Sequence, residues 1–293
     1  MRADAVAKVI RADQDKSSLS STAALDLGYR IGRRLLRQAS PTTLGIRFPE
    51  ISDAGQEEYW DNLYRGASGV GIALLDLLHA TGDAAYESPI REIAYDLIES
   101  IPSHFHLHPG LYVGNAGTAL FLLRAACTFR DTHLLSESCR LSDRLAERTF
   151  HGTDIISGAA GTGLFFLTMF NATRNDRYLE AARRAVAFLA EKAEPVEHGL
   201  TWAPLIPDWG ESTERYSPQT GLSHGVAGIC LFLLEMAAAT GEDLPGRLYE
   251  AGISWLDSRI VTVESRNYWP VSLEDPKLRY HWCHGPPASP MPT

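Results

Sequence analysis

Two short stretches of the chain contain side chains that could do chemistry. The first, GLSHGVAG, carries His224, and the second, YHWCHGPP, carries Cys283. A histidine titrates near neutral pH and suits proton transfer, whereas a Trp-Cys-His-Gly cluster is typical of the start of a metal or thiolate site. What these residues can do depends on the elements that position them.

Those elements repeat along the chain. Four stretches begin with Gly-x-x-Gly and continue as an apolar run of about a dozen residues, which predicts a helix buried on most of its circumference. Between them lie segments with 3.6-residue amphipathicity, which predict outer helices. Together they predict an all-α fold, an α/α toroid in which a double ring of inner and outer helices closes. The stretches begin at Gly66, Gly114, Gly158 and Gly225, a partial fifth at Gly285 has Ala288 as its second small residue, and the amphipathic segments are 88–101, 135–150, 176–193 and 244–260.

The repeated glycines have two interpretations. Small residues allow the helix starts to crowd together, and glycine accepts the φ angles of a tight loop. Alternatively, the unpaired N–H groups at the helix starts surround a site for anions or thiolates. Both can hold together, and we favour packing as the larger part.

Composition limits the class of protein. The chain has 293 residues, 45% of them hydrophobic, and a formal net charge of −9, so we expect no nucleic-acid partner. No run is long and apolar enough to cross a bilayer, and the charged start lacks the core of a signal peptide. Four cysteines do not make a disulfide framework, and we expect Cys127 and Cys230 in the core. We predict a single cytoplasmic domain over residues 1–293, with 1–21 as an N-terminal extension.

The glycine-opened helices, GLSHGVAG and WCHGPP together resemble the lanthionine synthetase C-like family, over about residues 22 to 288. The resemblance implies an α/α toroid of seven inner and seven outer helices. It also implies a cyclase that adds a cysteine thiol of a peptide to dehydroalanine or dehydrobutyrine, forming a thioether ring. The implied partners are a dehydrated precursor peptide and a dehydratase or kinase-type biosynthetic protein.

Four positions match the family's site residue by residue. The resemblance implies that His224 is the acid–base residue, that Asp154 orients it, and that Arg279 holds an anionic intermediate or Asp154 itself. It implies that Cys283 is the first thiolate ligand of a zinc ion. Taken singly, His224 could instead cap or satisfy a helix end, and Asp154 could be a first-turn carboxylate at a helix dipole.

The family's zinc site also needs an adjacent Cys-His pair from a later repeat. Here the second cysteine and the histidine ligand are missing, and residues 286–293 are too rich in proline to form another helix. We therefore expect an incomplete toroid that binds zinc poorly and self-associates through its open ring.

Three functions remain open. The first is a cyclase that is truncated or completed by another chain, and the second is a non-catalytic peptide-binding or scaffold protein. The least favoured is a toroidal glycoside hydrolase that uses Asp208 and Glu211. We interpret the loop histidines His104, His106 and His108 as a chance cluster rather than a weak metal site.

Overall fold

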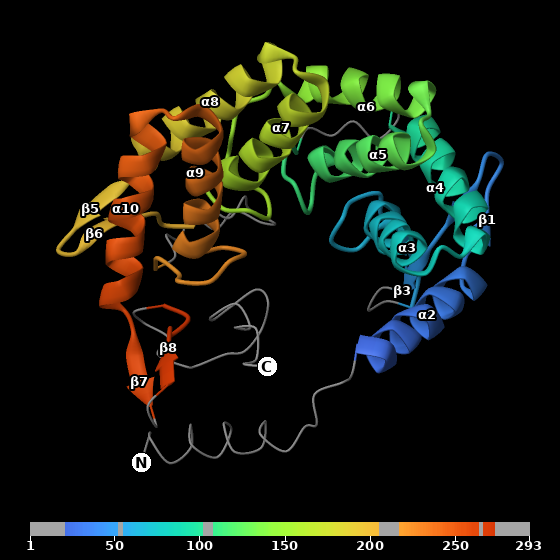
Figure 1. The fold of residues 1–293 in the computed structure, drawn as a ribbon, viewed down its shortest axis with the longest axis horizontal. Coiled ribbons are helices and arrows are strands. Elements are labelled where there is room, and N and C mark those ends of the chain that lie inside the picture. The colour runs from blue at the N-terminus through green and yellow to red at the C-terminus, as the bar shows by residue number, and fades with distance from the viewer. Residues whose placement is uncertain (1–20, 52–54, 102–107, 205–216, 264–265, 273–293) are drawn as a thin grey trace. The chain divides into compact units, whose positions relative to one another are not determined.

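The structure is a computed structural model that describes residues 21–51, 55–101, 108–204, 217–263 and 266–272. Its described residues divide after Arg148 into two compact units. We call the part up to Arg148 the first unit and the part from Thr149 the second unit. Each is built mainly of helices (Figure 1).

The first unit begins with one helix and two small hairpins and continues with two helix pairs. The hairpins pair β1 with β2 and β3 with β4, both antiparallel. The elements are α2 (Ser21–Arg37), β1 (Ser40–Pro41), β2 (Ile46–Arg47), β3 (Pro49–Ile51), β4 (Glu57–Tyr59), α3 (Ala67–Thr81), the 3-10 helix η1 (Ala84–Tyr86), α4 (Glu87–Ser100), α5 (Asn115–Phe129) and α6 (Thr132–Leu145).

The second unit also contains two helix pairs, each followed by a small hairpin. The hairpins pair β5 with β6 and β7 with β8. The elements are α7 (Ala159–Thr173), α8 (Asp176–Lys192), β5 (Glu194–Val196), β6 (Gly199–Thr201), α9 (Val226–Thr240), α10 (Asp243–Ser258), β7 (Val261–Val263) and β8 (Arg266–Tyr268).

The repeat predicted from the sequence is present in both units. Helices α3, α5, α7 and α9 each have 15 residues, and each begins directly after the first glycine of its motif. Each ends at a left-handed residue, which is Gly82, Arg130, Arg174 or Gly241, so the chain turns sharply into the following amphipathic helix. The four predicted helix pairs are therefore confirmed.

The seven residues before each of these helices form one recurring entry loop. In all four loops the first helical N–H donates to the carbonyl seven residues earlier, as Ala159 does to Gly152 at 2.8 Å and Val226 to Gln219 at 2.9 Å. The entry loops are residues 60–66, 108–114, 152–158 and 219–225. Helix-start N–H groups normally lack an intrahelical partner, and here a loop carbonyl accepts the first N–H of each of the four helices. At α3 and α7 the first four N–H groups all have carbonyl partners within the loop, so the interpretation as unpaired N–H groups is wrong for these two helix starts.

The glycine before each helix is required by close backbone packing. A Cβ at Gly114 would lie 2.0 Å from the His108 carbonyl oxygen, and one at Gly66 would lie 2.2 Å from the Trp60 oxygen. The φ angles of Gly66 and Gly114 are −119° and −126°, which any residue can adopt. The packing interpretation is therefore confirmed, with one correction: the crowding comes from the entry loop itself, and no unusual φ is involved.

The two units pack their glycine-started helices in the same way. In the first unit, Gly71 of α3 receives the ring of Phe121 of α5, since an added Cβ would lie 2.4 Å from that ring. In the second unit, Gly163 of α7 receives Phe232 of α9, with a corresponding distance of 2.3 Å. Phe121 and Phe232 are fully buried. Because the paired residues hold equivalent places in their repeats, each unit is a two-pair copy of the same packing scheme.

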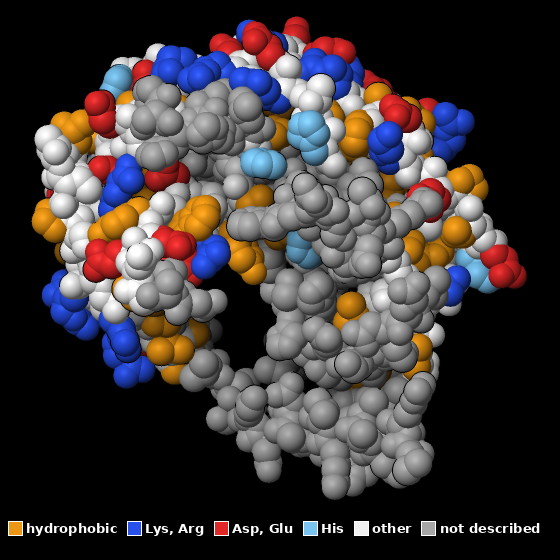
Figure 2. All heavy atoms as spheres, turned by 180° about the vertical axis from the view of Figure 1, so that it is seen from behind, with side chains coloured by type: hydrophobic (Ala, Val, Ile, Leu, Met, Phe, Trp, Pro, Cys, Tyr) orange, Lys and Arg blue, Asp and Glu red, His pale blue; other side chains and the backbone are white. Residues whose placement is uncertain are grey.

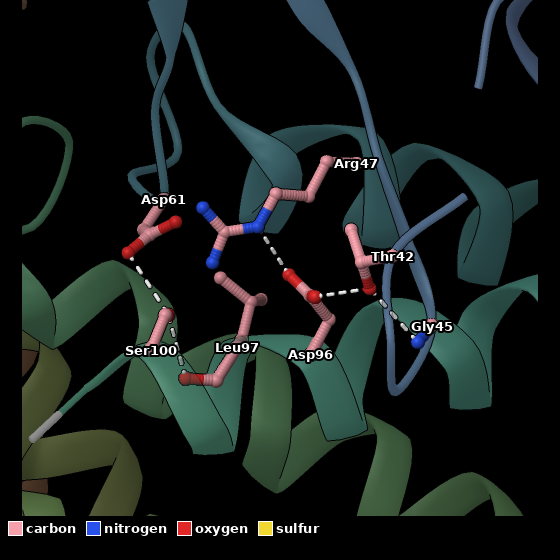
Figure 3. A network of polar contacts seen from close by, with 7 residues as sticks. All are labelled: Thr42, Gly45, Arg47, Asp61, Asp96, Leu97 and Ser100. Carbon is pink, nitrogen blue, oxygen red and sulfur yellow. Dashed lines mark hydrogen bonds and ion pairs between the residues drawn. The ribbon is translucent and has the colours of Figure 1, made fainter. Parts of the chain in front are cut away.

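A polar network fixes the first hairpin to α4 (Figure 3). Asp96 on α4 is 6% exposed. It accepts hydrogen bonds from the Thr42 hydroxyl at 2.5 Å and from the Arg47 guanidinium at 2.5 Å. Nearby, the Ser100 hydroxyl donates to Asp61 at 3.1 Å, which joins the end of α4 to the first entry loop. A buried carboxylate needs such partners, so we interpret this network as structural.

The cysteines divide between core and surface. Cys230 on α9 is buried, as predicted, beneath Gly252 of α10, where an added Cβ would lie 2.6 Å from the cysteine sulfur. Cys127 on α5 is exposed, so its predicted place in the core is wrong. Its helix is long and apolar, but the last turn leaves this position open to solvent. An apolar run thus predicts burial of a helix better than burial of each residue in it.

The surface carries mixed charge. On the face that Figure 2 shows, basic and acidic side chains are interspersed over the described residues, without a broad basic patch. Among the described helices, none is long and apolar enough to span a membrane.

Candidate acid–base site

Two predicted site residues meet in the second unit. Asp154 lies in the entry loop of α7 and His224 in the entry loop of α9. The imidazole Nδ1 of His224 is 2.6 Å from Oδ2 of Asp154. The Asp154 side chain is 3% exposed and the His224 side chain 28%. A buried carboxylate therefore contacts a ring that solvent can reach.

The second carboxylate oxygen of Asp154 is held by its own loop. Oδ1 accepts the backbone N–H of Ser157 at 2.9 Å and that of Gly158, also at 2.9 Å. The Ser157 hydroxyl is a third donor, at 3.2 Å from Oδ1. Several donors on one oxygen fix the rotation of the carboxylate and stabilise its charge. Oδ2 is thereby presented to the histidine.

The two entry loops are locked together beside this pair. The backbone N–H of Ile155, which follows Asp154, donates to the carbonyl of Ser223, which precedes His224, at 3.2 Å. The Ile155 side chain lies against Gly228, where an added Cβ would be 3.0 Å from it. In the first unit Leu63 lies against Gly117 in the same relation. The second glycine of the α5 and α9 motifs therefore makes room for the entry loop of the preceding repeat.

The equivalent loop of the first unit shows what the charge of Asp154 adds. Asn62 holds the same place before α3, and its side-chain oxygen accepts the Arg65 N–H at 2.9 Å. A neutral amide thus makes the same local turn. The other two entry loops have Gly110 and Gly221 at this place and still close. The carboxylate of Asp154 is therefore not needed to form the loop, and what distinguishes it is the contact with His224.

The geometry tests the structural roles that His224 and Asp154 could have at the helix starts. His224 does not cap α9: its Nδ1 bonds Asp154, and the N-cap Gly225 is without a side-chain cap. Asp154 does bond the N–H of Gly158 at the start of α7, so the first-turn interpretation holds for Oδ1 alone. In the tautomer with its proton on Nδ1, the Nδ1–H donates to the Asp154 carboxylate, which leaves Nε2 as the nitrogen for proton exchange with a substrate. The pair can act as an oriented acid–base group.

The other two predicted site residues, Arg279 and Cys283, lie outside the described residues. The described chain ends beside the fourth entry loop, because the Thr220 N–H donates to the Val271 carbonyl at 3.1 Å and the Thr220 hydroxyl donates to Pro270 at 2.5 Å. Gln219 and Ser272 form an antiparallel bridge. Residues 270–272 therefore run along the loop that carries His224.

The described residues do not provide a zinc site. Within them, no group of three or more His, Cys, Asp and Glu side chains could hold a metal ion. Asp154 is a poor ligand, since Oδ1 accepts three donors and Oδ2 contacts His224. His104 and His106 lie outside the described residues, as do Asp208 and Glu211. Cys283, the predicted zinc ligand, also lies outside the described residues.

Comparison with known proteins identifies the class. The sequence profile of the lanthionine synthetase C-like proteins matches residues 57–289, so the chain belongs to this family. A zebrafish (Danio rerio) protein named glutathione S-transferase LANCL1 is 29% identical over 86 residues. That match spans 29% of this chain and 20% of the relative's length, so the chain covers about a fifth of this curated protein.

Solved structures share the fold at low sequence identity. Nisin cyclase matches with a TM-score of 0.58 at 16% identity, covering 89% of this chain and 66% of its own. The GH76A α-1,6-mannanase of Salegentibacter sp. matches with a TM-score of 0.55 at 12% identity, covering 82% of this chain and 71% of its own. The predicted all-α, α/α-toroid fold class is confirmed by this likeness. At such identities the likeness shows the fold alone.

Proposed function

We propose that this chain is a thioether-forming cyclase, in which His224 and Asp154 provide acid–base catalysis. The proposal is carried by the 2.6 Å contact between the His224 imidazole and the buried Asp154 carboxylate, in a chain of the lanthionine synthetase C-like family. Its substrate would be a dehydrated precursor peptide delivered by a dehydratase or kinase-type partner. The name of one similar protein, a glutathione S-transferase, supports chemistry at a thiol.

The chemistry is an isomerisation that a single histidine can serve. The sulfur of a peptide cysteine forms a bond to the β-carbon of dehydroalanine or dehydrobutyrine, and the thiol proton ends on the α-carbon. His224 accepts that proton at Nε2 and returns it to the α-carbon, while Asp154 steadies the charged ring. We propose that Arg279 stabilises the enolate oxygen that forms between these steps. No oxidant or second substrate is consumed.

Zinc remains a proposal that rests on Cys283. When bound, a zinc ion converts a thiol to the more nucleophilic thiolate. Because the described residues provide no ligand set, the steps above are assigned to side chains alone. Elemental analysis of the purified chain before and after dialysis against a chelator measures the metal directly. We expect little zinc in the wild type, because Cys283 lacks the second cysteine and the histidine of the family's site. Stoichiometric, chelator-resistant zinc would contradict this expectation, and its persistence in a Cys283→Ser variant would exclude Cys283 as a ligand.

The test uses a model peptide that contains one dehydroalanine and one cysteine. Ring formation leaves the mass unchanged but removes the thiol, so alkylation followed by mass spectrometry measures it. We expect Asp154→Asn and His224→Asn each to slow thiol loss by about 10²-fold or more. Asp154→Asn should preserve the conformation of the entry loop, because Asn62 already makes this turn in the first unit. His151→Asn, at an exposed histidine of the same segment, is the matched control.

Two further arms separate the alternatives. Peptide binding without thiol loss, measured by fluorescence anisotropy, would replace the cyclase with a non-catalytic peptide-binding protein. A peptide whose cysteine is changed to serine, incubated with glutathione, tests transfer of an external thiol. A glutathione adduct that forms while the cysteine peptide stays open would overturn ring closure. Equal thiol loss in wild type and His224→Asn would remove the acid–base assignment.

A further inference from the structure

We propose that Ser157 is a positioning residue for the Asp154–His224 pair: its hydroxyl holds one carboxylate oxygen so that the other stays on the imidazole. This inference rests on the proposed acid–base function. The Ser157 hydroxyl lies 3.2 Å from Oδ1 of Asp154, and the Ser157 N–H lies 2.9 Å from the same oxygen. Among the donors to Oδ1, the hydroxyl is the one that a side-chain substitution can remove.

The loop itself does not need this hydroxyl. The last residue before the capping glycine is Ser157 in the third loop, Arg65 in the first and Val113 in the second. All three loops make the same bond from the first helical N–H, to Trp60 at 2.8 Å, His108 at 3.0 Å and Gly152 at 2.8 Å. A valine or an arginine at this place is thus compatible with a closed entry loop. The hydroxyl is left to act on the carboxylate.

The carboxylate has one rotation that matters here. Turning about its Cβ–Cγ bond would move Oδ2 away from the Nδ1 of His224, which is 2.6 Å distant. The backbone N–H groups of Ser157 and Gly158 donate to Oδ1. The Ser157 hydroxyl is a further donor that is not part of the loop backbone. A hydrogen bond to a charged group contributes more than one between neutral groups. Loss of this donor therefore loosens the pair without opening the loop.

The first measurement needs no substrate. In protein labelled with ¹⁵N-histidine, the Nδ1–H of His224 is observed by NMR and identified by its loss in His224→Asn. We expect Ser157→Ala to raise the exchange rate of this proton with water by about tenfold. Ser157→Thr, which keeps a hydroxyl, should restore the wild-type rate. Thr168→Ala on α7, which removes a hydroxyl bonded only within the helix backbone, should leave the rate unchanged.

The second measurement tests whether loss of the Ser157 hydroxyl also slows the reaction proposed for the Asp154–His224 pair. In the cyclisation assay we expect Ser157→Ala to lower kcat about tenfold with little change in KM, because the hydroxyl acts on His224 through Asp154. An unchanged Nδ1–H signal in Ser157→Ala would overturn the positioning role, whatever the assay gives. An altered signal in a protein whose wild type forms no ring would keep the positioning role and reject the cyclase. The two failures are therefore distinguishable.

Discussion

At the scale of single residues, burial decides which thiols can react. Cys230 is buried against α10, and burial raises the pKa of its thiol to about 12. A thiol reacts as its thiolate, and below pH 12 this group is mostly protonated. Cys127 is exposed on α5. The two cysteines, similar in their apolar sequence surroundings, therefore differ in chemistry.

We predict that iodoacetamide at pH 8 modifies Cys127 in the folded protein and leaves Cys230 unmodified until guanidinium chloride unfolds the chain. Peptide mapping by mass spectrometry reads both sites. A Cys127→Ser variant is the control, since it should remove the fast modification and leave Cys230 protected. Modification of Cys230 at a rate close to that of Cys127 in the folded protein would contradict its burial.

The positions of Asp154 and His224 were predictable because both residues lie in motifs that match the family. The resemblance also implied that Asp154 orients His224, and the two side chains are in contact. The geometry of that contact could not be read from the sequence, since loops 70 residues apart meet only through the packing of α7 on α9. Ser157 was missed for a similar reason. A serine before a glycine is common, and only its place beside a carboxylate gives it a role. Repetition offered one usable signal, because Asn62 and Asp154 precede their glycines by the same interval.

At the scale of elements, the entry loops invert an ordinary rule of helix capping. Serine at an N-cap usually stabilises a helix at least as well as glycine. At Gly114, however, an added Cβ would lie 2.0 Å from the His108 oxygen, and backbone atoms cannot turn aside as a side chain can. The fit of the loop therefore outweighs the cap.

We predict that Gly114→Ser lowers the free energy of unfolding by about 2 kcal/mol or more. The matched control is Asn175→Ser at the start of α8, where the side chain already caps the N–H of Arg177 and the change should cost less than about 0.5 kcal/mol. Denaturant unfolding followed by circular dichroism measures both. An unchanged or higher free energy of unfolding in Gly114→Ser would show that the loop backbone can move to accommodate the added Cβ.

Because the two units repeat the same packing, we predict that a second acid–base pair can be introduced into the first unit by substitution. Asn62 corresponds to Asp154, and Val113 corresponds to His224, because each precedes its capping glycine by the same interval. The contact of Leu63 with Gly117 matches that of Ile155 with Gly228. The double variant Asn62→Asp with Val113→His should therefore bring a carboxylate to an imidazole in the first unit. The NMR expectation is a second slowly exchanging Nδ1–H, absent from the Val113→His single variant.

The hairpins were beyond sequence analysis. Their strands have two or three residues, too few to show an alternating pattern. Local interactions set them: the Gly45 N–H donates to the Thr42 hydroxyl in the first turn, and Arg47 of β2 donates to Asp96. The long helices were predictable because their apolar runs and glycines repeat. Sequence reasoning thus found what is periodic and missed what is short.

At the scale of the whole chain, likeness of fold leaves the chemistry open. The cyclase and the mannanase match with similar TM-scores, 0.58 and 0.55, so the fold does not choose between them. The family profile over residues 57–289 places the chain among the lanthionine synthetase C-like proteins, and the proposal of a cyclase rests on this family and on the His224–Asp154 contact. We predict that the chain releases no sugar from α-1,6-mannan under conditions in which it consumes peptide thiols. Chromatographic detection of released oligosaccharides, with an Asp208→Asn, Glu211→Gln variant as control, would revive the hydrolase if release depended on those carboxylates.

The entry loops close through main-chain groups and one glycine, and this has a consequence for how such proteins diverge. Two positions can change while the loop keeps its closing hydrogen bond. The residue four places before the glycine is Asn62, Gly110, Asp154 or Gly221, and the residue directly before it is Arg65, Val113, Ser157 or His224. The glycine and the main-chain groups thus determine whether the loop folds, and the two variable positions determine whether it can react. Two substitutions could silence a lineage's chemistry and leave an intact fold. Relatives should therefore be sorted by these two positions in each repeat, since overall identity will mix active members with inactive ones.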